Sequence, residues 1–506
     1  MNATLSSIST VLLATMLFAA GLLSSPSAAA DNEGWVSLFD GKTLAGWKAS
    51  ENPASFRVVD GTIACDGPRA HLFYVGWHGK ASFENFEAQV EVRARAGANS
   101  GLYFHTAYQE KDWPAQGFEI QVDNSQKEHD GYRENKMTGS LYGIRNVYKA
   151  MAKDDEWFTL DVTVQKPRVE IRVNGTLVVS WIEPPGPLPA GAPKMNRLGR
   201  GSFAIQCHDP GSKVFYRNLR VRPLPEAPAL AAPMPVVDER YVRILALGRE
   251  NFPVVDLHAH LKGGLTIEQA LNLSRVTGMF LGIAVNCGKG FPVNDDAGAA
   301  EFLKTMEGQP VFVGLQAEGR EWVGMFSKET RAKFDYVFTD SMTWTNPAGK
   351  RMRLWMPEEV EIGPGPLNGQ MDAASREQAF MDLLVEKTVG ILETEPIDIY
   401  VNPTFLPAAI APRYDSLWTE ERMTRVIDAA VKHGVAIEIN ARYRIPSEPF
   451  LRLAKSKGAK FTFGTNNAGA NDLGDWSYPL DMQKKLGLKW QDMFIPGHQP
   501  SRAQRE

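Results

Sequence analysis

The sequence has few cysteines, little net charge and no apolar run of the length needed for an ordinary membrane span. Cys65, Cys207 and Cys287 are its three cysteines among 506 residues, and this small number excludes a disulfide scaffold. Cys65 and Cys207 fall in the same half of the chain and are near enough in the predicted fold to pair. The preferred interpretation is that they are small buried side chains.

The near balance of positive and negative charge bears on the partners that the protein can have. The chain carries 55 Lys and Arg against 59 Asp and Glu, a net charge of −4. This gives no reason to expect nucleic acid or an anionic membrane surface as partner. A length of 506 residues exceeds what one hydrophobic core usually serves, so at least two domains are expected.

The longest apolar run lies at the N-terminus, from Val11 to Leu23, and small residues follow it up to Ala30. This pattern predicts a signal peptide over residues 1–30, and a secreted or periplasmic protein without an integral span in the mature chain. No Lys or Arg precedes the run, so the terminal amine is its only positive charge. The alternative is an uncleaved N-terminal anchor.

Residues 31–222 are predicted to form an all-β sandwich. Short alternating runs bounded by turn residues fill this region, for example 86–96, 169–181 and 202–207. Asn174-Gly175 between two such runs is a strong hairpin signal. Regularly spaced strands without a helical period are typical of an antiparallel sandwich.

Residues 223–237 are rich in Pro and Ala and predict a semi-rigid linker. In residues 238–506, strand-like and helix-like segments alternate, which predicts a parallel α/β barrel. Barrel sites gather at the carboxyl ends of the strands. The polar residues at these predicted strand ends are His258, His260, Glu318, Asp340, Asn402, Glu438, Asn440, Asn466 and Asn467.

Polar side chains also recur at alternate positions in the first region, as one face of a strand requires. Carboxylates, amides and aromatic rings are the groups that bind sugar hydroxyls and stack on sugar faces. The candidates are Asn99, Tyr103, His105, Trp113, Glu119, Gln121, Asp123, Tyr142, His208 and Arg217. The alternatives are a solvated outer sheet face for the acidic strand, and core packing for the two tyrosines.

An ordered set of segments in this region resembles the 3-keto-disaccharide hydrolase family, whose jelly-roll domain is related to concanavalin A-like lectins. The segments are SLFDGKTLAGW, GANSGLYFH, GFEIQVD, TGSLYG, EWFTLDVTV, IRVNG, GSFAIQCHD and VFYRNLRV. The resemblance implies a carbohydrate substrate and a jelly-roll fold. It departs from the family at His105, where other members often have Arg.

The resemblance also implies a chemistry. A ketone at C3 acidifies the C2 proton of a sugar, so a base removes it, the glycosidic oxygen leaves C1, and water then adds. This requires a base with a tuned pKa and a group that stabilises the enolate oxygen. On this basis Glu119 or His208 is the base, Asp123 and Gln121 orient substrate or hold a metal, and Arg217 or His105 faces the oxyanion.

The second region begins with His258-Ala-His260 at a strand end, a pattern that projects two imidazoles to one side. It resembles PHP-type phosphoesterases and amidohydrolase-like barrels. Asn402, Asn466 and Ala468 stand where that family has ligands, and amides are poor ligands for zinc or manganese. What remains is a set for one divalent metal: His258, His260, Glu318 and Asp340. Alternatively, the asparagines bind a polar ligand, or the two histidines are structural.

Three functions are compatible with these features. The first is an exported hydrolase that cleaves 3-keto-glycosides in the sandwich. The second is a non-catalytic carbohydrate-binding sandwich attached to a metal-dependent or degenerate barrel hydrolase. The third is a two-domain binding protein of the cell envelope without turnover.

Overall fold

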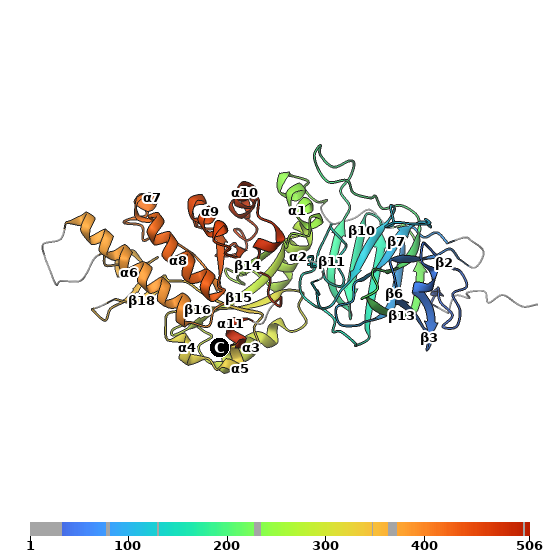
Figure 1. Ribbon diagram of the computed structural model, residues 1–506, viewed down its shortest axis with the longest axis horizontal. Coiled ribbons are helices and arrows are strands. Elements are labelled where there is room, and N and C mark those ends of the chain that lie inside the picture. The colour runs from blue at the N-terminus through green and yellow to red at the C-terminus, as the bar shows by residue number, and fades with distance from the viewer. Residues whose placement is uncertain are drawn as a thin grey trace, which may run out of the picture.

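The computed structural model describes residues 33–76, 81–128, 131–226, 234–346, 348–362, 372–498 and 501–505. The predicted signal segment and residues 227–233 of the predicted linker lie outside this part of the chain. A β-sandwich occupies one end of the molecule, and a barrel ringed by helices occupies the other (Figure 1). No helix in the described ranges is long and apolar enough to cross a membrane.

The larger sheet of the sandwich is antiparallel, in the order β11-β10-β9-β6-β13-β4-β3, with β1 paired to β13. Alternate residues of β6 and β9 are buried, so one face of this sheet covers the core and the other faces outward. The Asn174-Gly175 hairpin is confirmed, since both residues have positive φ between β10 and β11. The strands are β1 (Val36–Ser37), β3 (Phe56–Val59), β4 (Thr62–Asp66), β6 (Phe86–Ala94), β9 (Phe158–Gln165), β10 (Arg168–Val173), β11 (Thr176–Ile182) and β13 (Lys213–Pro223).

The smaller sheet has the order β2-β5-β12-β7-β8. It is more deeply buried than the larger sheet. Every residue of β5, β7 and β12 is buried, so both faces of this sheet are covered. One face packs on the sandwich core, and loops cover the other. A solvated outer face is therefore excluded for these three strands. The elements are β2 (Trp47–Ala49), η1 (Pro53–Ser55), β5 (Ala70–Tyr74), β7 (Ser100–Thr106), β8 (Phe118–Val122) and β12 (Ser202–Cys207).

The second region folds into a closed barrel of parallel strands in the order β14-β15-β16-β17-β20-β21-β22. A parallel α/β barrel was predicted, but the described residues give seven strands rather than the eight of a TIM barrel. Continuous burial along every strand except β15, which has two half-buried residues near its end, reflects a covering of helices outside and side chains within. The strands are β14 (Val255–Ala259), β15 (Phe280–Gly288), β16 (Phe312–Glu318), β17 (Tyr336–Thr339), β20 (Ile399–Tyr400), β21 (Ala436–Asn440) and β22 (Phe461–Gly464).

Capping residues mark the ends of several helices around the barrel. Thr266 and Thr419 cap α2 and α8, and left-handed Gly278 and Gly434 end them. A short hairpin joins β18 (Thr343–Thr345) and β19 (Arg351–Arg353). The helices are α1 (Glu239–Arg249), α2 (Ile267–Thr277), α3 (Asp296–Met306), α4 (Trp322–Met325), α5 (Lys328–Arg331), η2 (Pro357–Glu359), α6 (Ala373–Thr394), η3 (Ala411–Arg413), α7 (Tyr414–Leu417), α8 (Glu420–His433), α9 (Glu448–Ser456), α10 (Ser477–Leu486), η4 (Trp490–Asp492) and α11 (Arg502–Arg505).

The segment 131–149 of the sandwich joins the two regions. The Tyr148 ring lies 5.9 Å from that of Phe280 at the start of β15. The Lys149 Nζ donates to Asp335 Oδ2 at 2.8 Å. Arg145 donates to the carbonyl oxygens of Arg275 and Val276 at the end of α2, where a cation is favoured by the helix dipole. The sandwich therefore packs against the barrel at the amino ends of the strands, opposite the barrel mouth.

All three cysteines are free and buried, as preferred from the sequence. The Cys207 Sγ donates to the Gly67 carbonyl at 3.2 Å. Burial raises the pKa of the Cys207 thiol to about 11, so it is a packing group rather than a nucleophile.

Candidate functional site

The sandwich carries a cavity of about 370 Å³ on the loop-covered face of its smaller sheet. Strands β7, β8 and β12 form its floor, and the segments before β8 and after residue 131 form its walls. The polar and aromatic residues that line it are Asn99, Tyr103, Trp113, Glu119, Gln121, Tyr132, Glu134, Tyr142, Asn196, Gln206, His208 and Arg249.

Glu119 is the central carboxylate of this floor. It lies on β8 directly opposite Tyr103 of β7. The Gln206 Nε2 on β12 donates to Glu119 Oε1 at 2.8 Å and to the Tyr103 hydroxyl at 3.1 Å. Burial raises the pKa of Glu119 to about 7, although hydrogen bonds from Tyr103 and Gln206 oppose the rise. Its carboxyl group therefore changes protonation near neutral pH, which suits a general base.

A glycine beneath Glu119 makes this position possible. Gly101 faces Gln121 in the register of β7 and β8. A Cβ atom at Gly101 would collide with Glu119 Oε1. The Gly in NSGLYFH is therefore needed for the close approach of the carboxylate to the sheet.

His208 lies at the cavity edge, just after β12. Its Nδ1 is 2.8 Å from Asp209 Oδ2, which also accepts from the Ser212 hydroxyl at 2.8 Å. The Trp113 ring lies 5.3 Å from the His208 ring, and 44% of Trp113 is exposed. An exposed indole at a cavity rim offers a stacking surface for a sugar ring. A carboxylate that holds one imidazole nitrogen fixes the orientation of the other.

His71 is a neighbour of this site that the sequence analysis missed. It lies on β5 beside Gln206 of β12, and its ring packs 5.5 Å from Tyr103 and 5.6 Å from Trp113. Neither ring nitrogen has a partner in the described part of the protein. Burial lowers the pKa of His71 to about 4, so it is neutral at physiological pH. His71 occurs in a run without other polar residues, where the sequence gives no functional signal.

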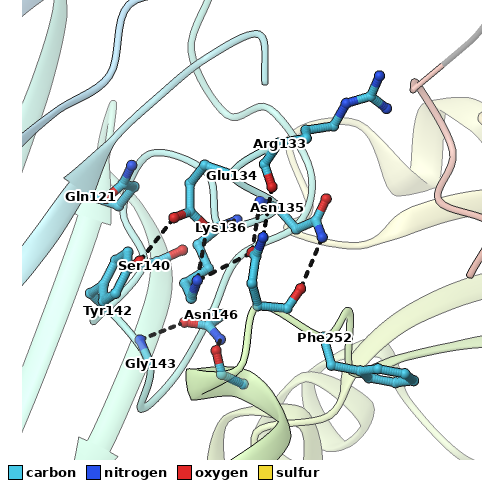
Figure 2. A network of polar contacts seen from close by, with 12 residues as sticks. Gln121, Arg133, Glu134, Asn135, Lys136, Ser140, Tyr142, Gly143, Asn146 and Phe252 are labelled. Atoms are coloured by element: carbon cyan, nitrogen blue, oxygen red, sulfur yellow. Dashed lines mark hydrogen bonds and ion pairs between the residues drawn. The ribbon is translucent and has the colours of Figure 1, made fainter. Parts of the chain in front are cut away.

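A second buried carboxylate, Glu134, was also missed. Its Oε2 accepts from the hydroxyls of Tyr132 at 2.7 Å and Tyr142 at 2.9 Å. Its Oε1 accepts from the Lys136 Nζ at 2.8 Å, and this ion pair is buried. Figure 2 shows the carboxylate between Tyr142 and Lys136. The network fixes the orientation of Tyr142 at the cavity wall.

The barrel region completes the wall of the sandwich cavity. Asn251, just after α1, accepts from Asn135 N at 3.0 Å and from Lys136 Nζ at 3.2 Å through Oδ1. The Asn251 Nδ2 in turn donates to Arg133 O at 2.6 Å. Two residues earlier, the Arg249 side chain lines the cavity. The sequence could not reveal this cation as part of the site, because it comes from the other predicted domain.

Among the predicted sugar-binding residues, Asn99, Tyr103, Trp113, Gln121 and Tyr142 come together at this cavity. The Gln121 Nε2 donates to Asn99 Oδ1 at 2.9 Å. This hydrogen bond links β8 to the residue just before β7. The predicted alternatives for the base, Glu119 and His208, line the same cavity.

Three predicted placements are wrong. His105 has a φ of 55°, beside an irregular pairing of β7 and β12, so the alternation of the strand ends there. Its Nε2 contacts the Glu84 carbonyl at 2.9 Å, away from the cavity. Arg217 lies on the larger sheet and pairs with Glu91 at 2.6 Å. Asp123 accepts from the backbone N–H of Ser125 and Gln126, so it caps a turn rather than lining the cavity.

Comparison with known proteins agrees with this geometry. Residues 34–222 match the profile of the 3-keto-alpha-glucoside-1,2-lyase-like domain. Residues 34–222 form a 3-keto-disaccharide hydrolase-like domain. A 3-keto-disaccharide hydrolase of Bacteroides thetaiotaomicron is 26% identical over 238 residues, which cover 38% of this chain and 80% of that protein.

Solved structures similar to this chain include a provisionally assigned glycosyl hydrolase from Parabacteroides distasonis. It is 22% identical, with a TM-score of 0.32, and the match covers 38% of this chain and 95% of that chain. The carbohydrate binding module CBM66 from Bacillus subtilis is 13% identical, with a TM-score of 0.25, and the match covers 35% of this chain and 96% of that chain.

Outside the 3-keto-disaccharide hydrolase-like domain, the predicted barrel residues gather at the carboxyl ends of the strands. His258 Nδ1 is 2.6 Å from Glu438 Oε1, and its Nε2 is 3.1 Å from Gln316 Oε1. Asp340 Oδ2 accepts from the Asn402 amide at 3.0 Å, and Asp340 Oδ1 accepts from Met342 N at 2.9 Å. Both nitrogens of His258 and both oxygens of Asp340 therefore have protein partners.

These contacts do not fit the predicted metal set of His258, His260, Glu318 and Asp340. Within the described ranges, no group of three or more His, Cys, Asp or Glu side chains is arranged to hold a metal ion. Two of the four predicted ligands already use their lone pairs or protons within the protein. A metal ion with three protein ligands, as in catalytic zinc sites, would require these contacts to break.

The asparagines of the barrel mouth form a connected network instead. Asn402 Oδ1 accepts from Asn440 at 3.0 Å and from Asn466 at 2.8 Å. Glu438 Oε2 accepts from Asn402 N at 2.6 Å. Asn467 holds the backbone of His260 through two hydrogen bonds of 2.7 and 2.9 Å. Most of this network consists of amides, which bind polar groups but transfer no protons near neutral pH.

Proposed function

We propose that the sandwich hydrolyses glycosides whose sugar carries a ketone at C3. One observation carries this proposal: Glu119 is a partly buried carboxylate on the cavity floor, and desolvation raises its pKa to about 7. Such a group is deprotonated in a large fraction of molecules at neutral pH and is basic enough to accept a carbon-bound proton. The similarity of residues 34–222 to 3-keto-disaccharide hydrolases supports the same chemistry.

In the proposed reaction, Glu119 takes the C2 proton, and the electron pair forms an enolate with the C3 ketone. The C1–O bond then breaks as the double bond forms between C1 and C2, and His208 gives a proton to the leaving oxygen. Water adds its hydroxyl to C1 and a proton to C2, which completes a net hydrolysis. The proposal assigns proton removal and leaving-group protonation to separate groups, because the proton leaves C2 and the departing oxygen is on C1.

Arg249 is the proposed partner of the enolate oxygen, in place of the predicted Arg217 and His105. Arg249 is among the residues that line the cavity, and a cation at a developing oxyanion stabilises the transition state. Tyr142, held by Glu134, and Gln121 are proposed to bind the other hydroxyls. Trp113 is proposed to stack on the sugar ring at the rim.

The decisive experiment compares a 3-keto-glucoside with its unoxidised parent as substrates for the full chain. Turnover of the ketone alone would support the proposal, since only the ketone acidifies the C2 proton. Equal turnover of both would contradict it, because direct displacement at C1 needs no ketone. Binding without turnover of either would favour a carbohydrate-binding module.

Export is also proposed for this protein, on the strength of the apolar run from Val11 to Leu23 and the small residues up to Ala30. N-terminal sequencing of the protein secreted or released from the periplasm should begin near Asp31. A mature chain that still begins with residue 1 would contradict a cleaved signal.

A further inference from the structure

The barrel mouth holds a cavity of about 740 Å³, separate from the cavity of the sandwich. Residues at or just after the ends of β14, β15, β16, β17 and β20 line it, as in other parallel barrels that bind ligands. Its volume lies in the range of small-molecule sites. The sandwich packs against the opposite end of the barrel strands, so the two cavities do not open to each other.

Two buried atoms in this cavity lack partners within the described ranges, His260 Nε2 and Glu318 Oε2. His260 is 1% exposed and Glu318 is 6% exposed, and both line the cavity. The His260 Nδ1 lies 2.9 Å from the Ala284 carbonyl, which only accepts, so Nδ1 carries the proton and Nε2 presents a lone pair. Buried polar atoms without partners are uncommon in folded proteins, and a bound ligand, ion or water at the site is one explanation for them.

The neighbours of Glu318 leave its second oxygen free for a ligand. Its Oε1 already accepts from the amides of Asn286 and Gln316, both at 3.1 Å. These two bonds hold the carboxyl group at the cavity lining, and Oε2 is left without a partner in the described part of the protein. Glu318 Oε2 and His260 Nε2 therefore form a pair of acceptor sites that a ligand with two hydroxyl groups would satisfy.

The rest of the lining restricts the ligand further. Lys262 and Arg442 bring positive charge to the cavity. Trp355 and Tyr443 provide aromatic surfaces, and Trp355 is 36% exposed at the mouth. Aromatic surfaces suit the C–H face of a sugar, and the cations suit an anionic substituent.

We propose that the barrel mouth is a second binding site, for a polyhydroxylated, anionic molecule of monosaccharide size, held without a metal ion. Two of its hydroxyls donate to His260 Nε2 and Glu318 Oε2, and its anionic group faces Lys262 and Arg442. The anionic group is a carboxylate or a phosphate. This proposal does not depend on the activity proposed for the sandwich.

The test is calorimetric titration of the full chain, freed of metal with a chelator, with D-glucuronate, D-glucose 6-phosphate and D-glucose. We expect one of the two anionic sugars to bind with 1:1 stoichiometry, and D-glucose to bind at least about tenfold more weakly. The anion that binds identifies the substituent as carboxylate or phosphate. Failure of both anionic sugars to bind would overturn the proposal.

Variants then locate the bound sugar. Glu318→Gln and Lys262→Met should each weaken binding by about tenfold, because one removes an acceptor and the other a charge. Lys432→Met, an exposed lysine on α8, is the matched control and should not change affinity. Lys262 is exposed, so its variant tests the site even if Glu318→Gln fails to fold. Binding that survives both site variants would overturn the proposal.

Two further results would contradict it. If Glu119→Gln abolished sugar binding while the barrel variants retained it, the ligand would lie in the sandwich. If the chelated protein bound one equivalent of Zn²⁺ or Mn²⁺, and Glu318→Gln abolished this, the two free atoms would be metal ligands instead. The proposed site predicts neither result.

Discussion

The sandwich and the barrel each place a carboxylate in the lining of a cavity, but the groups around the two carboxylates differ. Burial raises the pKa of both Glu119 and Glu318. Around Glu119 lie an imidazole paired to Asp209, three tyrosines and Arg249, groups that can move protons or stabilise charge. Around Glu318 lie the amides of Asn286 and Gln316, together with His260, Lys262 and Asp340. We therefore propose catalysis for the first cavity and ligand binding for the second.

The largest expected effect is that of Glu119→Gln on turnover of a 3-keto-glucoside. The substitution preserves shape but removes the proposed base, so kcat should fall by about 10²- to 10⁴-fold with the Tm little changed. Glu301→Gln, an exposed change on α3, is the control. An equally large fall in kcat from Glu318→Gln would show that the barrel takes part in the chemistry. The two cavities would then not differ in the way proposed.

The pH dependence of kcat/KM sharpens the same contrast. Glu119 acts as a base only when deprotonated, and its pKa is raised to about 7. Activity should therefore rise with pH through a midpoint near 7 and be about a hundredfold lower at pH 5 than on the plateau. A midpoint near pH 4.5, the ordinary value for glutamate, would show that Glu119 is not the titrating base. The residual activity of Glu119→Gln should not show this rise of kcat/KM with pH.

Arg249→Met tests whether the barrel region supplies part of the sandwich site. Loss of a cation at the enolate should lower kcat/KM by about tenfold or more, with most of the effect on kcat. Arg249→Lys should restore part of the activity, because it returns the charge. Arg217→Met, on the larger sheet of the sandwich, is the matched control. A larger fall in kcat/KM from this variant would support Arg217 as the partner of the oxyanion, as the sequence predicted.

The smallest expected effect on activity is that of Asn251→Ala. It leaves the buried Asn135 N–H and the Lys136 ammonium short of an acceptor, so the free energy of unfolding should fall by about 1–3 kcal/mol. The KM should rise several-fold, since the same network orients Tyr142 through Glu134. Denaturant unfolding and steady-state kinetics measure the two quantities. An unchanged unfolding free energy would mean that the Asn251 hydrogen bonds do not couple the stabilities of the two regions.

Particular residues show how far the sequence could predict this site. Glu119 and Gln121 were correctly placed together because residues two apart on a strand share a face. His105 was misplaced by the same rule, because its positive φ breaks the alternation at the strand end. Arg217 was misplaced because a basic residue on a nearby strand gives no sign of which sheet the strand joins. Glu134 and Arg249 were missed because they lie on a loop and a helix without a motif.

The sequence by itself determined the two regions, the sandwich and barrel classes, and which side chains share a strand face, since these follow from local periodicity and turn chemistry. Only the tertiary structure decided which faces meet. Gln206 reaches Glu119 across 87 residues, and Asn251 reaches Asn135 across 116. Contacts of this kind depend on strand order, sheet register and domain packing, which non-local burial of apolar surface sets. The spacing of residues along the chain therefore does not predict these contacts.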